Sequence, residues 1–249
     1  MPFLMAGDPN LDITYKILLK LQDKGADFIE LGIPYSDPLA DGPIIQLSAS
    51  KALKSGTSLT KVLELLNNLK DKLHVPVILF SYFNPLLSFG FNKFCEIASD
   101  SGASGIIIPD LPLEETTEYS QIAKHFNLDL ILLVAPTTPI DRMRIIAEST
   151  RGFSYLVSVT GVTGERNNLE NRVENLVKKL RELSSNPIAV GFGISSPEHI
   201  KKVKKWGADG VIVGSAFVKR ISENSQLNVV NELGKFCDEM RSAADENLD

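Results

Sequence analysis

Short apolar runs alternate with helix-like segments along the whole chain, and this alternation constrains the fold more than any single motif. The runs are continuously apolar, as in VPVILF at 75–80, rather than alternating between apolar and polar residues. Continuous runs are typical of strands covered on both faces, and therefore of a parallel sheet. We expect strands at 2–5, 27–33, 75–80, 104–110, 129–134, 153–157, 187–191 and 210–214. The intervening segments repeat apolar residues at helical spacing, which predicts helices at 13–24, 44–53, 59–73, 91–99, 114–126, 141–149, 169–183, 197–206 and 227–241.

Eight strand–helix units fit a closed barrel. Three junctions carry Gly-Ala-Asp or Gly-Ala-Ser (25–27, 102–104 and 207–209), where a helix ends and a strand begins. An open, doubly wound sheet is the alternative, but it would need a glycine-rich nucleotide-binding turn after the first strand, and residues 6–9 are AGDP. No linker or composition shift divides the chain. The sequence therefore predicts one α/β domain over residues 1–249, a (β/α)8 TIM barrel with its site at the carboxyl ends of the strands.

Composition argues against several classes of partner. The net charge is −5, so nothing indicates binding to nucleic acid or to an anionic membrane surface. No apolar run approaches the length that spans a membrane, and the first residues lack the charged segment of a signal peptide. Cys95 and Cys237 have neither paired nor metal-like spacing. We expect a cytoplasmic protein (or a stromal one, if plastid-derived) with no metal site.

One strand and the loop after it carry two carboxylates that point to acid–base chemistry. Glu30 lies inside an apolar run, where an unpaired charge is costly, and Asp41 lies in the proline-rich loop that follows. Desolvation can raise the pKa of one carboxyl while a more solvated neighbour stays ionised, which gives two similar groups two roles. The alternative is structural: Glu30 pairs with a buried base and Asp41 caps a helix. Position alone favours neither interpretation.

Glycine-bearing turns follow the last three strands, at 161–164, 191–195 and 214–217. In barrels, the loops after strands seven and eight commonly bind phosphate together with a short extra helix. Glycines let backbone N–H groups approach an oxyanion, and a helix N-terminus adds a favourable dipole. Glycines also serve tight turns, but three of them in consecutive units favour a phosphorylated small molecule as the ligand.

Aromatic side chains are expected between these two ends of the site. Glu30 ends the second strand, nearly opposite strands seven and eight, so a substrate that reaches both has its phosphate most of a barrel's width from its reacting centre. Aromatic residues at strand ends would suit a flat apolar body between the two, although they could equally fill the core. These residues are Phe3, Tyr82, Tyr155 and Phe192.

The run ELGIPYSDPLADGP (30–43) closely resembles the signature of the tryptophan synthase α subunit family. AGDP (6–9), GVTG (161–164), GFGI (191–194) and VGSA (213–216) resemble further motifs of that family, in the same order and spacing. The resemblance covers nearly the whole chain. It implies a lyase of tryptophan biosynthesis, which cleaves indole-3-glycerol phosphate to indole and glyceraldehyde 3-phosphate by a retro-aldol reaction.

The resemblance also implies a role for each matching residue. Glu30 is expected to be the general acid–base that protonates the indole C3 and takes the proton from the glycerol hydroxyl. Asp41 is expected to accept a hydrogen bond from the indole N–H and to stabilise the positive charge of the indolenine-like tautomer, with Thr163 orienting it. The other matching positions are expected to bind phosphate (Gly164, Gly193, Gly214 and Ser215) or to line the indole pocket (Phe3, Tyr82, Tyr155 and Phe192).

The resemblance further implies an α2β2 heterotetramer, in which indole passes to a tryptophan synthase β subunit that carries pyridoxal phosphate. This chain is expected to hold no cofactor of its own. Asp37 and Pro38 are expected to face the β subunit, and the loops at 34–43 and 158–168 to act as lids. Family members usually carry a short helix before the first strand, whereas Met1 directly precedes that strand here. Either the chain is shortened, or the barrel floor is closed differently. We expect a lower stability than in full-length relatives, because the apolar floor would be more exposed.

Three other functions fit part of the pattern. A stand-alone indole-3-glycerol phosphate lyase would share the barrel and both acids without needing a partner. A phosphosugar isomerase would share the scaffold, but the aromatic residues and the long acidic signature argue against it. A catalytically inactive interaction subunit would bind phosphate or the β subunit without chemistry, and the presence of both Glu30 and Asp41 argues against that interpretation.

Overall fold

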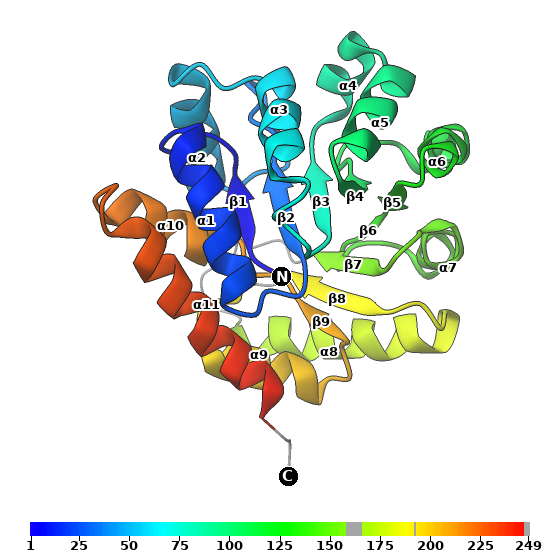
Figure 1. Cartoon of the computed structure of the whole chain (residues 1–249). Coiled ribbons are helices and arrows are strands. Elements are labelled where there is room, and N and C mark those ends of the chain that lie inside the picture. The colour runs from blue at the N-terminus through cyan, green and yellow to red at the C-terminus, as the bar shows by residue number, and fades with distance from the viewer. Residues whose placement is uncertain (158–165, 192, 247–249) are drawn as a thin grey trace.

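The computed structural model describes residues 1–157, 166–191 and 193–246. Its strands form a ring, and the helices make an outer layer around it (Figure 1). Five strands pair in parallel in chain order: β1 (Phe3–Met5), β2 (Ile29–Gly32), β3 (Val77–Phe80), β4 (Ala103–Ile107) and β5 (Asp129–Ile131). Four more pair in the same way: β6 (Leu133–Val134), β7 (Ser154–Val157), β8 (Ile188–Gly191) and β9 (Gly210–Val211).

Two junctions close these strands into a barrel. Between the last strand and the first, the Phe3 N–H donates to the Val213 carbonyl at 2.9 Å, and the Val213 N–H donates to the Met1 carbonyl at 2.9 Å. Between β5 and β6, Leu132 turns its N–H to the Thr150 hydroxyl at 2.9 Å. The Leu132 carbonyl still accepts from the Tyr155 N–H at 3.2 Å, so β5 and β6 act as one interrupted strand. The predicted eight-stranded (β/α)8 barrel is therefore confirmed.

Successive side chains of a strand point to opposite faces of the sheet. One set therefore packs in the barrel interior and the other packs against the helices. A buried apolar cluster in the interior is made of Ile78, Ile107, Ile131, Phe153, Tyr155, Ala189 and Ile212. The outward-facing residues that alternate with them along the strands belong to a larger cluster beneath the helices, which includes Ile29, Leu31 and Leu79. Glu30 lies between Ile29 and Leu31 on β2, so its side chain faces the interior of the barrel.

The outer layer contains every helix that the sequence predicted, together with α4 and α10, which it did not. The bounds are α1 (Leu11–Asp23), α2 (Pro43–Lys54), α3 (Leu59–Leu69), α4 (Phe83–Phe89), α5 (Phe91–Asp100), the 3-10 turn η1 (Leu113–Glu115), α6 (Thr116–His125), α7 (Ile140–Ser149), α8 (Arg166–Leu183), α9 (Pro197–Lys205), α10 (Ser215–Glu223) and α11 (Val229–Asp245). Helix α4 starts with help from a distant residue, because the Phe83 N–H donates to the Asp110 carboxylate at 2.8 Å. None of the described helices is both long and apolar enough to cross a membrane.

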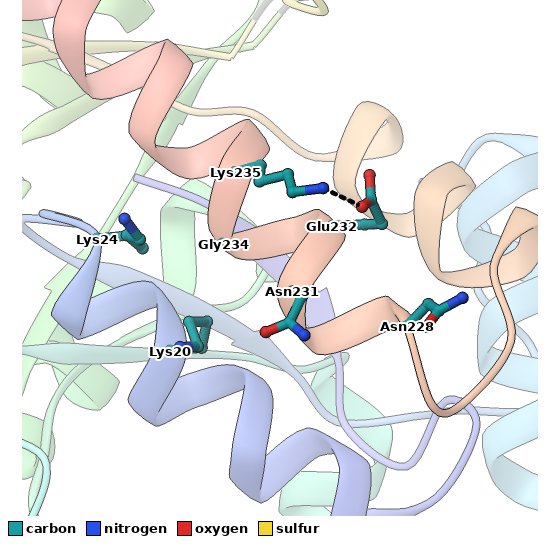
Figure 2. A pocket seen from close by; sticks show the side chains of 7 residues that line it. All are labelled: Lys20, Lys24, Asn228, Asn231, Glu232, Gly234 and Lys235. Carbon is teal, nitrogen blue, oxygen red and sulfur yellow. Dashed lines mark hydrogen bonds and ion pairs between the residues drawn. The ribbon is translucent and has the colours of Figure 1, made fainter.

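Helices α1 and α11 lie side by side on the outer wall. Figure 2 shows the groove between them, where Lys20 and Lys24 lie across from Gly234 and Asn231. The glycine permits this close approach, because a Cβ atom at position 234 would lie 2.8 Å from the Lys20 Cγ.

A hollow of about 710 Å³ lies at the amino ends of the strands, where Met1, Phe28, Phe153, Val211 and Met240 line it. Phe28 is 39% exposed there. This apolar surface forms the floor of the barrel, and the lower stability expected from its exposure stays a prediction.

Candidate active site

Glu30 is a buried acid in the middle of β2, with only 1% of its surface exposed. In register, Phe3 of β1 lies on one side of it and Ile78 of β3 on the other. Burial raises the pKa of Glu30 to about 8, and the nearby charge of Asp41 adds to this, whereas the Met1 amino group and a hydrogen bond from Tyr155 oppose it. Its Oε2 atom is buried without a hydrogen-bond partner among the described residues. A buried carboxyl with an unpartnered oxygen is suited to carrying a proton rather than a charge.

Tyr155 faces Glu30 across the interior from β7. It is 8% exposed, and burial together with the neighbouring carboxylates of Glu30 and Asp41 holds its pKa well above the usual value, so it stays a neutral donor. Space for its ring comes from β8, where a Cβ atom on Gly191 would lie 2.6 Å from the Tyr155 Cε2 and 2.8 Å from its hydroxyl oxygen. A glycine is therefore required beside Tyr155 if the ring is to keep this position.

Asp41 lies at the end of the loop that follows β2, one residue before the N-cap of α2. Backbone contacts shape the loop there: the Asp41 N–H donates to the Pro38 carbonyl at 3.1 Å, and the Gln46 amide donates to the Asp41 carbonyl at 2.8 Å. Burial raises the pKa of Asp41 to about 6, and a hydrogen bond from the Tyr82 hydroxyl lowers it. Near pH 7, Glu30 is mostly protonated and Asp41 mostly ionised.

A row of aromatic rings connects the two ends of the site. Phe3 packs edge-on against Phe80 at 5.9 Å between centroids, Phe80 packs edge-on against Tyr82 at 6.2 Å, and Tyr82 lies 5.5 Å from Tyr35. The sequence predicts Phe3 and Tyr82 as members of this row, but not Phe80 and Tyr35. Phe80 could have been found, because it lies two residues after Ile78 and so points to the same face of β3.

The predicted phosphate end lies where α10 begins. Ser215 is the exposed first residue of this helix and Gly214 is its N-cap, and a Cβ atom on Gly214 would lie 3.7 Å from the Phe3 Cβ. The first N–H groups of a helix have no partner within it, so they are available to an anion. Gly193, with φ of 46°, takes a left-handed conformation after the neighbouring strand β8. Thr163, Gly164 and Phe192 lie outside the described residues.

The predicted partner surface lies on the same loop as Asp41. Asp37 is exposed and Pro38 is half-buried, and the next residue, Leu39, is 82% exposed. An exposed leucine beside an exposed acid is available for contact with another protein. The assignment of Asp37 and Pro38 to a partner surface stays a prediction.

These groups together offer an acid that holds a proton at neutral pH, an ionised carboxylate beside it, an aromatic wall, and a helix N-terminus for an anion. Glu30 and Asp41 lie on and just after β2, whereas the N-terminus of α10 follows the last strand, β9. The chemistry of these groups therefore suits an elongated, phosphorylated aromatic molecule and the movement of a proton at one end of it.

Comparison with known proteins places this architecture in one family. The family model described as "Tryptophan synthase alpha chain" matches residues 1–245. A protein of that name from Prochlorococcus marinus subsp. pastoris is 71% identical over 246 residues, which are 99% of this chain and 88% of the relative. One from Synechococcus elongatus is 50% identical over 245 residues, covering 98% of this chain and 91% of the relative.

Solved structures agree with this result. A chain from the tryptophan synthase α2β2 complex of Pyrococcus furiosus has a TM-score of 0.91 and 39% identity, covering 97% of this chain and 96% of that one. The tryptophan synthase α-subunit of the same organism, solved separately, has a TM-score of 0.90 and 38% identity, with the same coverage.

Proposed function

This chain belongs to the tryptophan synthase alpha chain family, and we propose that Glu30 and Asp41 are the catalytic pair with which it acts. Its reaction is the retro-aldol cleavage of indole-3-glycerol phosphate to indole and glyceraldehyde 3-phosphate, so it is a carbon–carbon lyase of tryptophan biosynthesis. One observation carries the assignment of the pair. Glu30 and Asp41 interact electrostatically, and burial sets the pKa of Glu30 to about 8 and that of Asp41 to about 6.

The reaction needs a proton donor that becomes a base. The protonated Glu30 gives its proton to the indole C3, which leaves a positive charge on the ring and its nitrogen. Asp41 accepts a hydrogen bond from the indole N–H and stabilises that charge. The Glu30 carboxylate then takes the proton of the glycerol hydroxyl as the aldehyde forms. The bond between C3 and the glycerol carbon breaks, its electrons return to the ring, and Glu30 ends the cycle protonated.

The remaining proposed residues bind the substrate. Gly193, Gly214 and Ser215 hold the phosphate, since α10 presents free N–H groups and a positive dipole end beside Phe3. Phe3 and Tyr155 line the indole pocket from β1 and β7, together with Tyr82 after β3. By family resemblance, Phe192 also lines the pocket, Gly164 binds phosphate, and Thr163 orients Asp41.

A β subunit completes the pathway that we propose. The Pyrococcus furiosus relative is described as part of a mutually activating α2β2 complex, and this chain would assemble in the same way through the loop that holds Asp37 and Pro38. Indole would pass to the β subunit, which would carry the pyridoxal phosphate, and this chain needs no cofactor for its own step. The cyanobacterial origin of the similar proteins supports a cytoplasmic location.

The test is the release of indole from indole-3-glycerol phosphate, with and without a β subunit. Glu30→Gln and Asp41→Asn are each expected to lower kcat by at least about a hundredfold. Glu64→Gln removes an exposed acid on α3 and should keep the rate of the unmodified chain. A steep rise in rate on adding β supports the α2β2 assignment, and fast release without β would instead indicate a stand-alone lyase. If Glu30→Gln kept full turnover, the assignment of the acid would be wrong.

A further inference from the structure

We propose that the Tyr82 hydroxyl is a positioning group for Asp41, which fastens the 34–42 loop to the start of α4. This role goes beyond a wall of the indole pocket, for which the aromatic ring alone would suffice. The inference rests on the proposed catalytic role of Asp41.

The hydroxyl contacts the loop at two neighbouring residues. The Ala40 N–H donates to the Tyr82 hydroxyl oxygen at 3.0 Å. The Asp41 carboxylate lies near the same hydroxyl, and the interaction between the two lowers the pKa of Asp41. A tyrosine hydroxyl has one proton to donate and lone pairs to accept with, so it can make both contacts at once. It therefore holds both the backbone just before Asp41 and the side chain of Asp41.

A second contact ties the beginning of the loop to the same place. The Tyr35 ring lies 5.5 Å from the Tyr82 ring, tilted by 35°. The Tyr35 hydroxyl accepts a hydrogen bond from the Asn84 amide at 3.2 Å. The loop is thus attached at both of its ends to residues 82–84.

The attachment point is buried, whereas the loop is exposed. Tyr82 is 2% exposed and lies two residues after the end of β3, with Phe80 packed edge-on against it. The next residue, Phe83, donates its N–H to Asp110 at 2.8 Å, which anchors the start of α4 to the segment after β4. On the loop, Leu39 is 82% exposed. Since the loop has little buried surface of its own, the contacts with Tyr82 and Tyr35 decide where Asp41 lies.

Tyr82→Phe removes the hydroxyl and keeps the ring, so it separates the two roles. We expect kcat to fall by about tenfold with a smaller change in KM, because Asp41 acts on charge that develops during the reaction. The acidic limb of the pH profile should move to higher pH, since the lost hydrogen bond favoured the ionised Asp41. Glu30 and Tyr155 face Asp41 from β2 and β7, and Asp110 faces Tyr82; these groups stay unchanged in the variant.

Hydrogen exchange gives a readout that does not depend on catalysis. The Ala40 amide should exchange about tenfold faster in Tyr82→Phe, because its acceptor is gone. Tyr35→Phe, which removes only the hydrogen bond from Asn84, should cause a smaller acceleration. Tyr119→Phe is the matched control: its ring packs edge-on against Phe83 at 4.8 Å, next to Tyr82, and it should change neither exchange nor rate.

A double-mutant cycle completes the test. In the Asp41→Asn background, Tyr82→Phe should lower kcat no further, since the residue acts through Asp41. The positioning role is wrong if Tyr82→Phe leaves the Ala40 exchange and the acidic limb unchanged, or if its effect on kcat is the same with Asn at position 41. Full activity of Asp41→Asn with accelerated Ala40 exchange in Tyr82→Phe would overturn the proposed function and leave the fastening of the loop intact.

Discussion

Replacing Glu30 by glutamine should change how the stability of the protein depends on pH. In the folded protein Glu30 is buried and its pKa rises from 4.5 to about 8. The folded state therefore binds the proton more tightly than the unfolded chain does. Stability is highest while both states are protonated, falls as the pH rises above 4.5, and levels off above 8. Glutamine has nearly the same shape and no proton to lose.

The size of the effect follows from the shift. One pKa unit corresponds to about 1.4 kcal/mol, so the whole shift of Glu30 amounts to about 5 kcal/mol of stability. By the same linkage, about 2–3 kcal/mol of this is lost between pH 5 and pH 7, and about 4 kcal/mol between pH 5 and pH 9. Relative to the unmodified chain, Glu30→Gln should gain these amounts, whatever constant cost the buried amide adds at every pH.

The assay is urea unfolding of both proteins at pH 5, 7 and 9, followed by far-ultraviolet circular dichroism. Groups that do not interact with Glu30 titrate alike in both proteins, so they cancel in the difference of unfolding free energies, and the coupling of Glu30 to Asp41 and to the Met1 amino group is smaller than the effect of burial. A difference that stays constant within about 1 kcal/mol over this range would mean that the folded protein does not hold Glu30 neutral. That result would remove the physical basis for its role as the acid.

Two further substitutions test the packing around the barrel. Gly234→Ala should lower the melting temperature, because the new Cβ would lie 2.8 Å from the Lys20 Cγ. In a Lys20→Ala background, where this clash is absent, the same substitution should stabilise α11 by up to about 1 kcal/mol. Equal effects in both backgrounds would contradict the steric explanation. Ser48 donates to the buried Asp8 carboxylate at 2.5 Å, so Ser48→Ala should cost about 1–3 kcal/mol at pH 7. Because burial raises the pKa of Asp8, that carboxyl is more protonated at pH 4, and the stability lost through Ser48→Ala should be smaller there. Thermal melts at pH 4 and pH 7 test this, and an equal loss of stability at both pH values would contradict the explanation.

Much of the candidate site could be predicted because it depends on local sequence. Glu30 stands out as a carboxylate inside an apolar run, and such a run becomes a buried strand in almost any arrangement of the barrel. Asp41 follows it in the adjoining loop, and Ser215 lies in the glycine-bearing turn after the last strand. The parallel barrel itself follows from the repeated apolar runs, since strands with two apolar faces must be covered on both sides.

The sequence by itself determined the order of strands and helices, and that a buried acid and a loop acid follow the second strand. Only the tertiary structure decided what surrounds them. Tyr155 reaches Glu30 from β7 because Gly191 leaves room for its ring, and the Tyr82 hydroxyl meets the Asp41 loop from the start of α4. Contacts of this kind join residues that are far apart along the chain. The pKa values of the two acids depend on these neighbours and on burial, so they become defined only when the barrel closes.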